Sequence, residues 1–309
     1  MAGSGSLVSI NPLSREGWFR SAARRLRRRL AIPEKTRIAL AKLNRRNHPA
    51  TFIAITGSSG KTTTTSLLAH ILSGLAPTSR QIFSNALRGI SGAVMRASRK
   101  DRFVVLEVAA SGRSSVAQLA EIAKPDVAIV TMVGLEHYSA FRSLEAVAAE
   151  KGHLVAAVQP RGFAPLNADD EHVLAMRGRT GERIVPFGRS ETADFRVLST
   201  EFAFPGPLTL RIAWGGREET LTSPLPGSHF CVSVAAAFAA AVELGVPVPV
   251  APAARRCSAN DVGAGRGSMA SRRGIVRPSC DAADGAGIFG LQRPQVPAGR
   301  QSPKDTIPH

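Results

Sequence analysis

The sequence is poor in cysteine. Its 309 residues include only Cys231, Cys257 and Cys280, and no two of them have the CxxC spacing. Three cysteines are too few for a disulfide scaffold, so we expect a reducing compartment, the cytoplasm. Internal repeats are absent from the sequence as well.

Long uninterrupted apolar runs are also lacking. The first twelve residues contain no apolar core of the signal-peptide kind. The longest apolar stretch, 231–254, is interrupted by Glu243 and three prolines, so we interpret it as a packed helix followed by a loop rather than a membrane span. Hydrophobic residues still make up 44% of the chain, which excludes wholesale disorder and allows a sizeable core.

Acidic residues are scarce relative to basic ones, and the net charge is +17. Such a charge first suggests a nucleic-acid or membrane-surface partner. Its distribution is uneven, however: residues 1–50 carry +10, residues 251–309 carry +5, and residues 51–250 carry only +2. We therefore expect no nucleic-acid partner for the nearly neutral middle of the chain.

The two basic flanks differ from the middle in pattern, which divides the chain into three regions. In 1–50, apolar residues from Trp18 onward lie among arginines, and Pro33 splits the run into two short helices. We interpret this region as a basic helical arm that either covers the domain edge or makes weak contact with an anionic membrane surface. Residues 251–309 hold eight glycines and six prolines without sustained periodicity. We interpret them as a poorly structured tail, disordered or produced by a shifted reading frame, which the nucleotide sequence can decide.

Residues 51–250 alternate between apolar runs and helical patterns. Strands are predicted at 51–56, 102–107, 126–131, 161–166 and 183–187, and helices at 62–75, 114–123 and 143–158. This alternation predicts an α/β fold with a mostly parallel sheet and helices on both faces. Residues 194–222 alternate like a small antiparallel β layer, and 229–244 predict a final alanine-rich helix.

One motif stands between the first predicted strand and the first predicted helix. It reads Gly57-Ser58-Ser59-Gly60-Lys61-Thr62-Thr63 and has the spacing GxxGK[ST]. Glycines let a backbone approach phosphate oxygens, and a helix N-terminus favours an anion. Lys61 would reach the β- and γ-phosphates and Thr62 would reach Mg²⁺, so the motif predicts a phosphate-binding loop.

This loop and the segments after it resemble the Mur ligase family, most of all its MurF type. The further matching segments are Leu106-Glu107-Val-Ala-Ala110, Ala123-Lys-Pro-Asp126, Gly134-Leu-Glu-His137, Glu150-Lys151-Gly152, Leu166-Asn167-Ala-Asp-Asp170 and Pro224-Leu-Pro-Gly-Ser-His229. They follow the family's order and cover about 50–250, the central ATP-binding domain.

The resemblance implies ATP-dependent amide-bond formation through an acyl phosphate, in peptidoglycan precursor synthesis. It implies ATP bound by 57–63 and Asn167, and Mg²⁺ held by Thr62, Glu107, His137 and Lys151, with Lys61, His137 and Lys151 as the catalytic residues. The implied substrates are a nucleotide-sugar peptide and an amino acid or dipeptide, and a monomer is expected.

Several of these residues also have plainer interpretations. Glu107 could be a solvated strand-end acid, and His137 a surface polar group. Lys151 is either carbamylated, as in several members of the family, or an exposed helix lysine pairing with Glu150 or Glu145. Asp169 and Asp170 could cap the next helix.

The sequence departs from the family pattern in its flanks. Neither flank resembles the family's substrate-binding domains, Ser84 to Gly89 matches an asparagine-rich segment only in part, and Phe230, Cys231 and Ser233 stand in an element that usually has asparagines. We therefore expect a truncated ligase with ATP·Mg²⁺ binding retained and ligation impaired. The alternatives are another amide ligase of this fold, like folylpolyglutamate or cyanophycin synthetase, or a non-catalytic nucleotide-binding protein with a membrane-surface arm.

Overall fold

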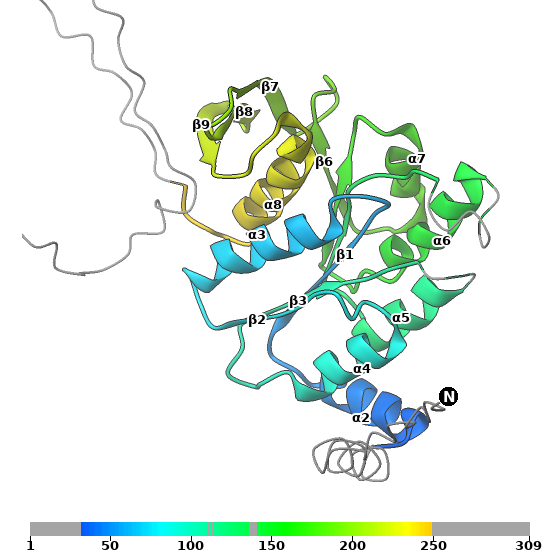
Figure 1. Cartoon of the computed structure of the whole chain (residues 1–309). Helices are drawn as coiled ribbons and strands as arrows, with labels where there is room; N and C mark the ends of the chain where they lie inside the picture. Colours follow the sequence, from blue (N-terminus) through cyan, green and yellow to red (C-terminus); the bar gives the residue numbers. More distant parts are fainter. Residues whose placement is uncertain (1–31, 111, 113, 136–140, 142, 249–309) are drawn as a thin grey trace, which may run out of the picture.

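A computed structural model of the chain describes residues 32–110, 112, 114–135, 141 and 143–248 (Figure 1). The first predicted helix of the arm, His137 and the predicted tail lie outside the described residues.

Strands and helices alternate through most of the described chain. In order, the elements are α2 (Glu34–Arg46), β1 (Thr51–Thr56), α3 (Lys61–Ser73), β2 (Thr78–Gln81), α4 (Leu87–Arg96), β3 (Phe103–Glu107), α5 (Ser115–Ala123), β4 (Val127–Val130), α6 (Leu144–Ala156), β5 (Phe163–Asn167), α7 (Glu171–Leu174), β6 (Arg183–Gly188), β7 (Phe195–Phe202), β8 (Leu208–Trp214), β9 (Arg217–Ser223) and α8 (Cys231–Glu243). Short 3-10 turns cover Ala175–Arg179 and Ser228–Phe230.

All of the strands belong to one sheet with the order β2-β3-β1-β4-β5-β6-β7-β8-β9. Pairing is parallel from β2 to β7 and antiparallel between β7, β8 and β9. β1 lies between β3 and β4, in register Ala54 to Leu106 and Ala54 to Ala128. The chain thus moves from one side of β1 to the other between β3 and β4, and in open α/β sheets ligands bind at the carboxyl end of such a switch point.

Helices cover both faces of this sheet, as Figure 1 shows. Side chains alternate along β1: Phe52 and Ala54 join the core beneath α2, α4, α5 and α6, whereas Ile53 and Ile55 join the core beneath α3 and α8. Both cores contain fully buried residues, which explains why the central strands are continuous apolar runs. Within the described ranges, every helix is too short or too polar to cross a bilayer.

The predicted fold class is confirmed. The predicted antiparallel layer exists as β7 to β9, but it extends the main sheet through a short parallel pairing of β6 with β7. Two elements were not predicted: β2, with no apolar run in Thr78–Gln81, and α4, which contains two glycines and has no side-chain cap.

The second predicted helix of the arm is α2, and it packs on the body of the domain. Ala41 is completely buried, and Ile38 packs against the core beneath α4 and α5. The Arg45 guanidinium donates to the Ala123 carbonyl oxygen at 2.8 Å and to both carboxylate oxygens of Asp126 at 2.9 Å. These contacts tie α2 to the turn between α5 and β4.

Candidate active site

The turn from β1 into α3 requires glycine at two positions. Gly57 has φ +151°, and a Cβ placed there would lie 1.9 Å from Oγ1 of Thr131. Gly60 has φ +81° and immediately precedes the first residue of α3. Both conformations are ones that residues with side chains rarely adopt, so the two glycines bring the backbone close to the end of β4.

Hydrogen bonds hold this loop against the segment that follows β4. The Ser58 N–H donates to the Met132 carbonyl oxygen at 2.8 Å, and the Gly134 N–H donates to the Ser58 hydroxyl at 2.8 Å. The Thr131 hydroxyl donates to the Ser59 carbonyl oxygen at 2.6 Å. The loop is therefore fixed from a neighbouring strand, which is the preorganisation that an anion site needs.

Lys61 places a positive charge on this loop. Its Nζ donates to the Gly57 carbonyl oxygen at 2.5 Å and to the Ser58 carbonyl oxygen at 3.3 Å. Lys61 also opens α3, a helix of 13 residues whose first turn leaves N–H groups without helical acceptors. The helix dipole and the ammonium together favour an anion at this turn.

Thr62, in the first turn of α3, contacts Glu107 at the end of β3. The Thr62 hydroxyl donates to Oε2 of Glu107 at 2.8 Å, and the Glu107 side chain is only 2% exposed. The interpretation of Glu107 as a solvated strand-end acid is therefore wrong. A hydroxyl and a carboxylate oxygen at this distance are both ligands that Mg²⁺ accepts.

Asn85 completes this cluster, and the sequence did not single it out. Its Nδ2 donates to Oε1 of Glu107 at 2.8 Å, so each carboxylate oxygen has one donor. The only signal for Asn85 was its place in a partial match to an asparagine-rich segment. Among the described residues, no group of three or more His, Cys, Asp and Glu gathers.

Lys151 lies on the inner side of α6 and is completely buried, so its interpretation as an exposed lysine is wrong. Its neighbour Glu150 caps the start of α5. Oε1 of Glu150 accepts the Val116 N–H at 2.7 Å, and Oε2 accepts the Ser114 N–H at 2.8 Å. Burial removes the Lys151 side chain from water, so its interactions within the protein decide its state.

Asn167 ends β5 and lies one strand away from the loop. Its Nδ2 donates to the Thr131 carbonyl oxygen at 2.8 Å, and the Thr131 hydroxyl in turn contacts the loop. Asp170 caps α7, as one interpretation expected, by accepting the Val173 N–H at 3.1 Å. Asp169 does not cap this helix; it accepts the N–H groups of Arg189 and Ser190 beyond β6.

The structure thus gathers the loop 57–63, Glu107 and the segment after β4 at the carboxyl edge of the sheet. His137 lies outside the described residues. Ser233 near the start of α8 also reaches this edge, with its hydroxyl 3.5 Å from the Gly60 carbonyl oxygen. Thr131 and Ser233 both contact the loop, and no local sequence pattern predicted these contacts.

Comparison with known proteins agrees with this geometry. The family model of the Mur ligase middle domain matches residues 55–241. A UDP-N-acetylmuramoyl-tripeptide–D-alanyl-D-alanine ligase of Mycobacterium tuberculosis is 38% identical over 211 residues, which are 66% of this chain and 40% of that protein. A UDP-N-acetylmuramate–L-alanine ligase of Streptomyces avermitilis is 36% identical over 206 residues, which are 63% of this chain and 41% of that protein.

A solved structure resembles the chain over a similar extent. The MurF ligase from Thermotoga maritima in complex with ADP superposes with a TM-score of 0.63 at 25% identity, covering 70% of this chain and 51% of that chain. The chain therefore spans about two fifths of the length of these two curated relatives and about half of this structure.

Proposed function

The chain belongs to the Mur ligase family, whose middle domain matches more than half of its length, and from this premise we propose that residues 51–250 bind ATP with Mg²⁺. We further propose that the bound nucleotide serves amide-bond formation in peptidoglycan precursor synthesis. The observation that carries the proposal is the Thr62–Glu107 contact of 2.8 Å beside a glycine loop that has room for no side chain at Gly57.

The residues of the loop would hold the triphosphate. Backbone N–H groups at the start of α3 offer donors to phosphate oxygens, and the Lys61 ammonium offers a charge that is already held at the loop. Such a site works by positioning the phosphoryl group and by neutralising its charge.

The Thr62 hydroxyl and the Glu107 carboxylate would hold Mg²⁺, and Asn85 would keep the carboxylate oriented toward it. When bound, the ion would neutralise charge on the phosphates. We extend the same proposal to His137 as a ligand of a second Mg²⁺ and to Asn167 as a contact of the nucleotide base, both by family resemblance.

We propose that Lys151 is carbamylated in the active protein. The family resemblance supports this proposal, because an ammonium near Mg²⁺ would repel the ion whereas a carbamate can ligate it. Carbon-13 NMR of the protein in labelled bicarbonate should show a carbamate resonance that is absent from Lys151→Met and kept in Lys100→Ala. Identical spectra for all three proteins would contradict the modification.

The substrates in this proposal are a UDP-muramoyl peptide and a dipeptide, as the curated relative's name implies for that protein. Ligation should be weak, because the element around α8 has Phe230 and Ser233 where the family usually has asparagines, and Ser233 lies beside Gly60. Measuring ATP-dependent phosphate release with and without UDP-muramoyl-tripeptide and D-alanyl-D-alanine tests this level of the proposal. Equal rates of phosphate release with and without these substrates would contradict ligation and support only nucleotide binding or hydrolysis.

ATP·Mg²⁺ binding, measured by titration calorimetry, tests the site itself. Lys61→Ala should lower the affinity by about tenfold or more, because it removes a charge-assisted contact to phosphate. The matched control is Lys100→Ala, an exposed lysine far from the loop in sequence, which should bind as the parent does. Equal ATP affinities of Lys61→Ala and the control would contradict the proposal that residues 57–63 bind phosphate.

A further inference from the structure

Segment 131–134, which follows β4, is bonded to the loop after β1. Its Met132 carbonyl oxygen accepts the Ser58 N–H at 2.8 Å. The Gly134 N–H donates to the Ser58 hydroxyl at 2.8 Å, and this hydroxyl donates back to the Gly134 carbonyl oxygen at 2.9 Å. The Thr131 hydroxyl donates to a further carbonyl oxygen of the loop at 2.6 Å. The shape of the loop therefore depends on where this segment lies.

The turn from β5 into α7 bonds the same segment from its other side. Nδ2 of Asn167 donates to the Thr131 carbonyl oxygen at 2.8 Å, and Oδ2 of Asp170 accepts the Val133 N–H at 2.7 Å. A hydrogen bond from a backbone N–H to a carboxylate is charge-assisted and belongs to the stronger kind. The segment is thus held between the loop on one side and two polar side chains on the other.

These two side chains are themselves fixed. Asn167 is only 4% exposed, and its Oδ1 accepts the Asp169 N–H at 3.0 Å, so both ends of its amide have partners within the protein. The other carboxylate oxygen of Asp170 accepts the Val173 N–H at 3.1 Å in α7. The N–H that follows Asn167 donates to a carbonyl oxygen of β6 at 2.8 Å. The sheet and α7 therefore give segment 131–134 a firm support.

We propose that Asn167 and Asp170 are positioning residues that hold the loop in its anion-binding shape through segment 131–134. They set the affinity for the polyphosphate chain of a nucleotide without contacting that chain. The reason is preorganisation, since a loop that is already fixed in its bound shape loses less conformational entropy on binding. This inference rests on the proposed nucleotide site. It is separate from the base contact proposed for Asn167, because it acts equally on a polyphosphate that has no base.

The inference differs in its consequences from two simpler roles. If the contacts only stabilised the fold, their loss would lower the free energy of unfolding and leave the affinity of the folded protein unchanged. If Asn167 acted only on the base, its replacement would weaken ATP binding and leave the binding of inorganic tripolyphosphate unchanged. Tripolyphosphate is therefore the ligand that separates the three roles.

Asp170→Ser removes the contact with segment 131–134 and keeps the start of α7. A serine oxygen can still cap the helix, whereas a single oxygen cannot also reach the Val133 N–H. The matched control is Asp169→Ser at the neighbouring position, where the carboxylate accepts two backbone N–H groups beyond β6. Both substitutions remove one negative charge, which by itself favours an anion, so a loss of affinity in Asp170→Ser alone reports the shape of the loop.

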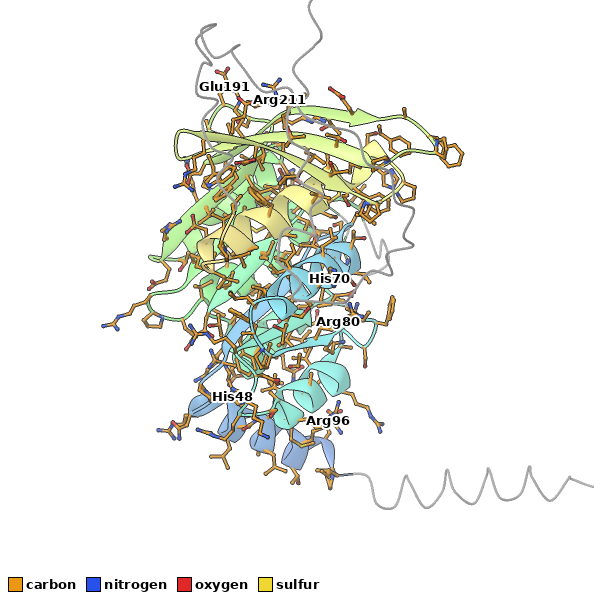
Figure 2. All side chains as sticks on the ribbon, turned by 90° about the vertical axis from the view of Figure 1, so that its left-hand side faces the viewer. His48, His70, Arg80, Arg96, Glu191 and Arg211 are labelled. Atoms are coloured by element: carbon orange, nitrogen blue, oxygen red, sulfur yellow. The ribbon has the colours of Figure 1, made fainter. Side chains whose placement is uncertain are left out.

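Asn167→Leu removes the donor to Thr131 with little change of size and none of charge. Its control is Asn44→Leu, because Nδ2 of Asn44 likewise donates to a carbonyl oxygen, in the last turn of α4, at 2.9 Å. Figure 2 shows His48, just after α2, and Arg96, at the end of α4, at the same end of the molecule. This control therefore lies near the amino end of β1, whereas the loop follows the carboxyl end.

Titration calorimetry of the full chain, with ATP·Mg²⁺ and with tripolyphosphate and Mg²⁺, measures the effect. Asn167→Leu and Asp170→Ser should each lower the affinity for both ligands by about fivefold or more, because binding must then order the loop. The two controls should stay within about twofold of the parent, since they share no contact with the loop.

Amide hydrogen exchange adds a measurement that is local to the loop. The N–H groups of Ser58 and Gly134 should exchange faster in Asn167→Leu and in Asp170→Ser than in the parent, and at the parent's rate in the controls. Circular dichroism of the same samples shows that each variant is folded. The two variants break separate contacts, so either one decides the question if the other does not fold.

Tripolyphosphate binding at the parent's affinity in the folded variants would overturn the inference, and so would an equal loss in Asp169→Ser. A loss that affects ATP alone would also overturn it and would leave Asn167 with the base contact only. A parent protein that binds neither ligand would overturn the nucleotide site and this inference with it. Unaffected variants of a parent that does bind would overturn the inference alone.

Discussion

At the scale of single residues, the loop after β1 depends on the absence of a side chain at Gly57. The nearest atom to a Cβ at this position would be Oγ1 of Thr131, which also donates to the Ser59 carbonyl oxygen. A methyl group would therefore push apart the two segments that shape the loop. We therefore expect this displacement to weaken the loop's affinity for phosphate.

Gly57→Ala should abolish measurable ATP·Mg²⁺ binding in calorimetry, because the left-handed backbone and the 1.9 Å contact both oppose the substitution. Gly178→Ala is the matched control, since a Cβ at Gly178 meets nothing within 4 Å. The control should bind ATP normally. Retained binding in Gly57→Ala would show that the loop tolerates the displacement and that its geometry is not what selects phosphate.

Glu107→Gln separates metal binding from nucleotide binding. The substitution keeps the size of a side chain that is 2% exposed but removes the charge that would hold Mg²⁺. We expect the Mg²⁺ dependence of ATP binding to shift to at least about tenfold higher concentration, while binding in the presence of a chelator stays the same. If the Mg²⁺ dependence does not move, the Thr62–Glu107 pair is structural only.

At the scale of elements, the Arg45 guanidinium makes several of the polar contacts that hold α2 on the domain. Arg45 bonds the carbonyl oxygens at the end of α5, pairs with Asp126, and stacks over the Phe52 ring at 4.4 Å from its centroid. The same Asp126 accepts the Phe52 N–H at 2.7 Å, so helix, turn and strand share one polar cluster. This cluster therefore contributes to the position of α2 on the domain.

Arg45→Met should lower the free energy of unfolding by about 3 kcal/mol, because it leaves a partly buried carboxylate and helix-end carbonyls without their donor. The control is Arg211→Met, which breaks an exposed pair with Glu218 and should cost about 1 kcal/mol or less. Urea unfolding of both variants measures the difference. Equal losses of unfolding free energy would mean that Arg45 stabilises the fold no more than the exposed Arg211 does.

At the scale of the whole molecule, the strands form a continuous sheet rather than two separate layers. The antiparallel β7 to β9 extend it, and Trp214 of β8 packs edge-to-face on Phe238 of α8, with ring centroids 5.0 Å apart. Because α8 also packs on α3, the antiparallel end shares a core with the loop-bearing end. The two ends should therefore unfold together.

Urea unfolding followed by tryptophan fluorescence and by far-ultraviolet circular dichroism should give coincident transitions. Fluorescence reports β8 through Trp214, whereas circular dichroism reports all helices. A fluorescence transition at clearly lower urea, with most helical signal retained, would show that β7 to β9 open independently. Trp18→Phe assigns the fluorescence change to Trp214, since these are the only two tryptophans.

Much of the fold followed from local patterns. β1 and β3 are buried on both sides and therefore appear as apolar runs, and glycines before Lys61 mark a turn that only glycine can make. β2 was not predicted because it is a half-buried edge strand with no apolar run. α4 was not predicted because its two glycines obscure the helical periodicity of its apolar residues. Glu107 ends β3 and Thr62 lies in the first turn of α3, and the structure brings their side chains into contact.

What the sequence by itself determined is therefore most of the strands and helices, the glycine turn before Lys61 and the resemblance to the family, because each depends on residues close together in the chain. Only the tertiary structure decided that Asn85 holds Glu107, that Thr131 supports the loop, and that Lys151 is buried. These facts depend on which strands lie side by side and which helix face meets the core. The packing of the whole chain sets these contacts, and the spacing of nearby residues does not reveal them.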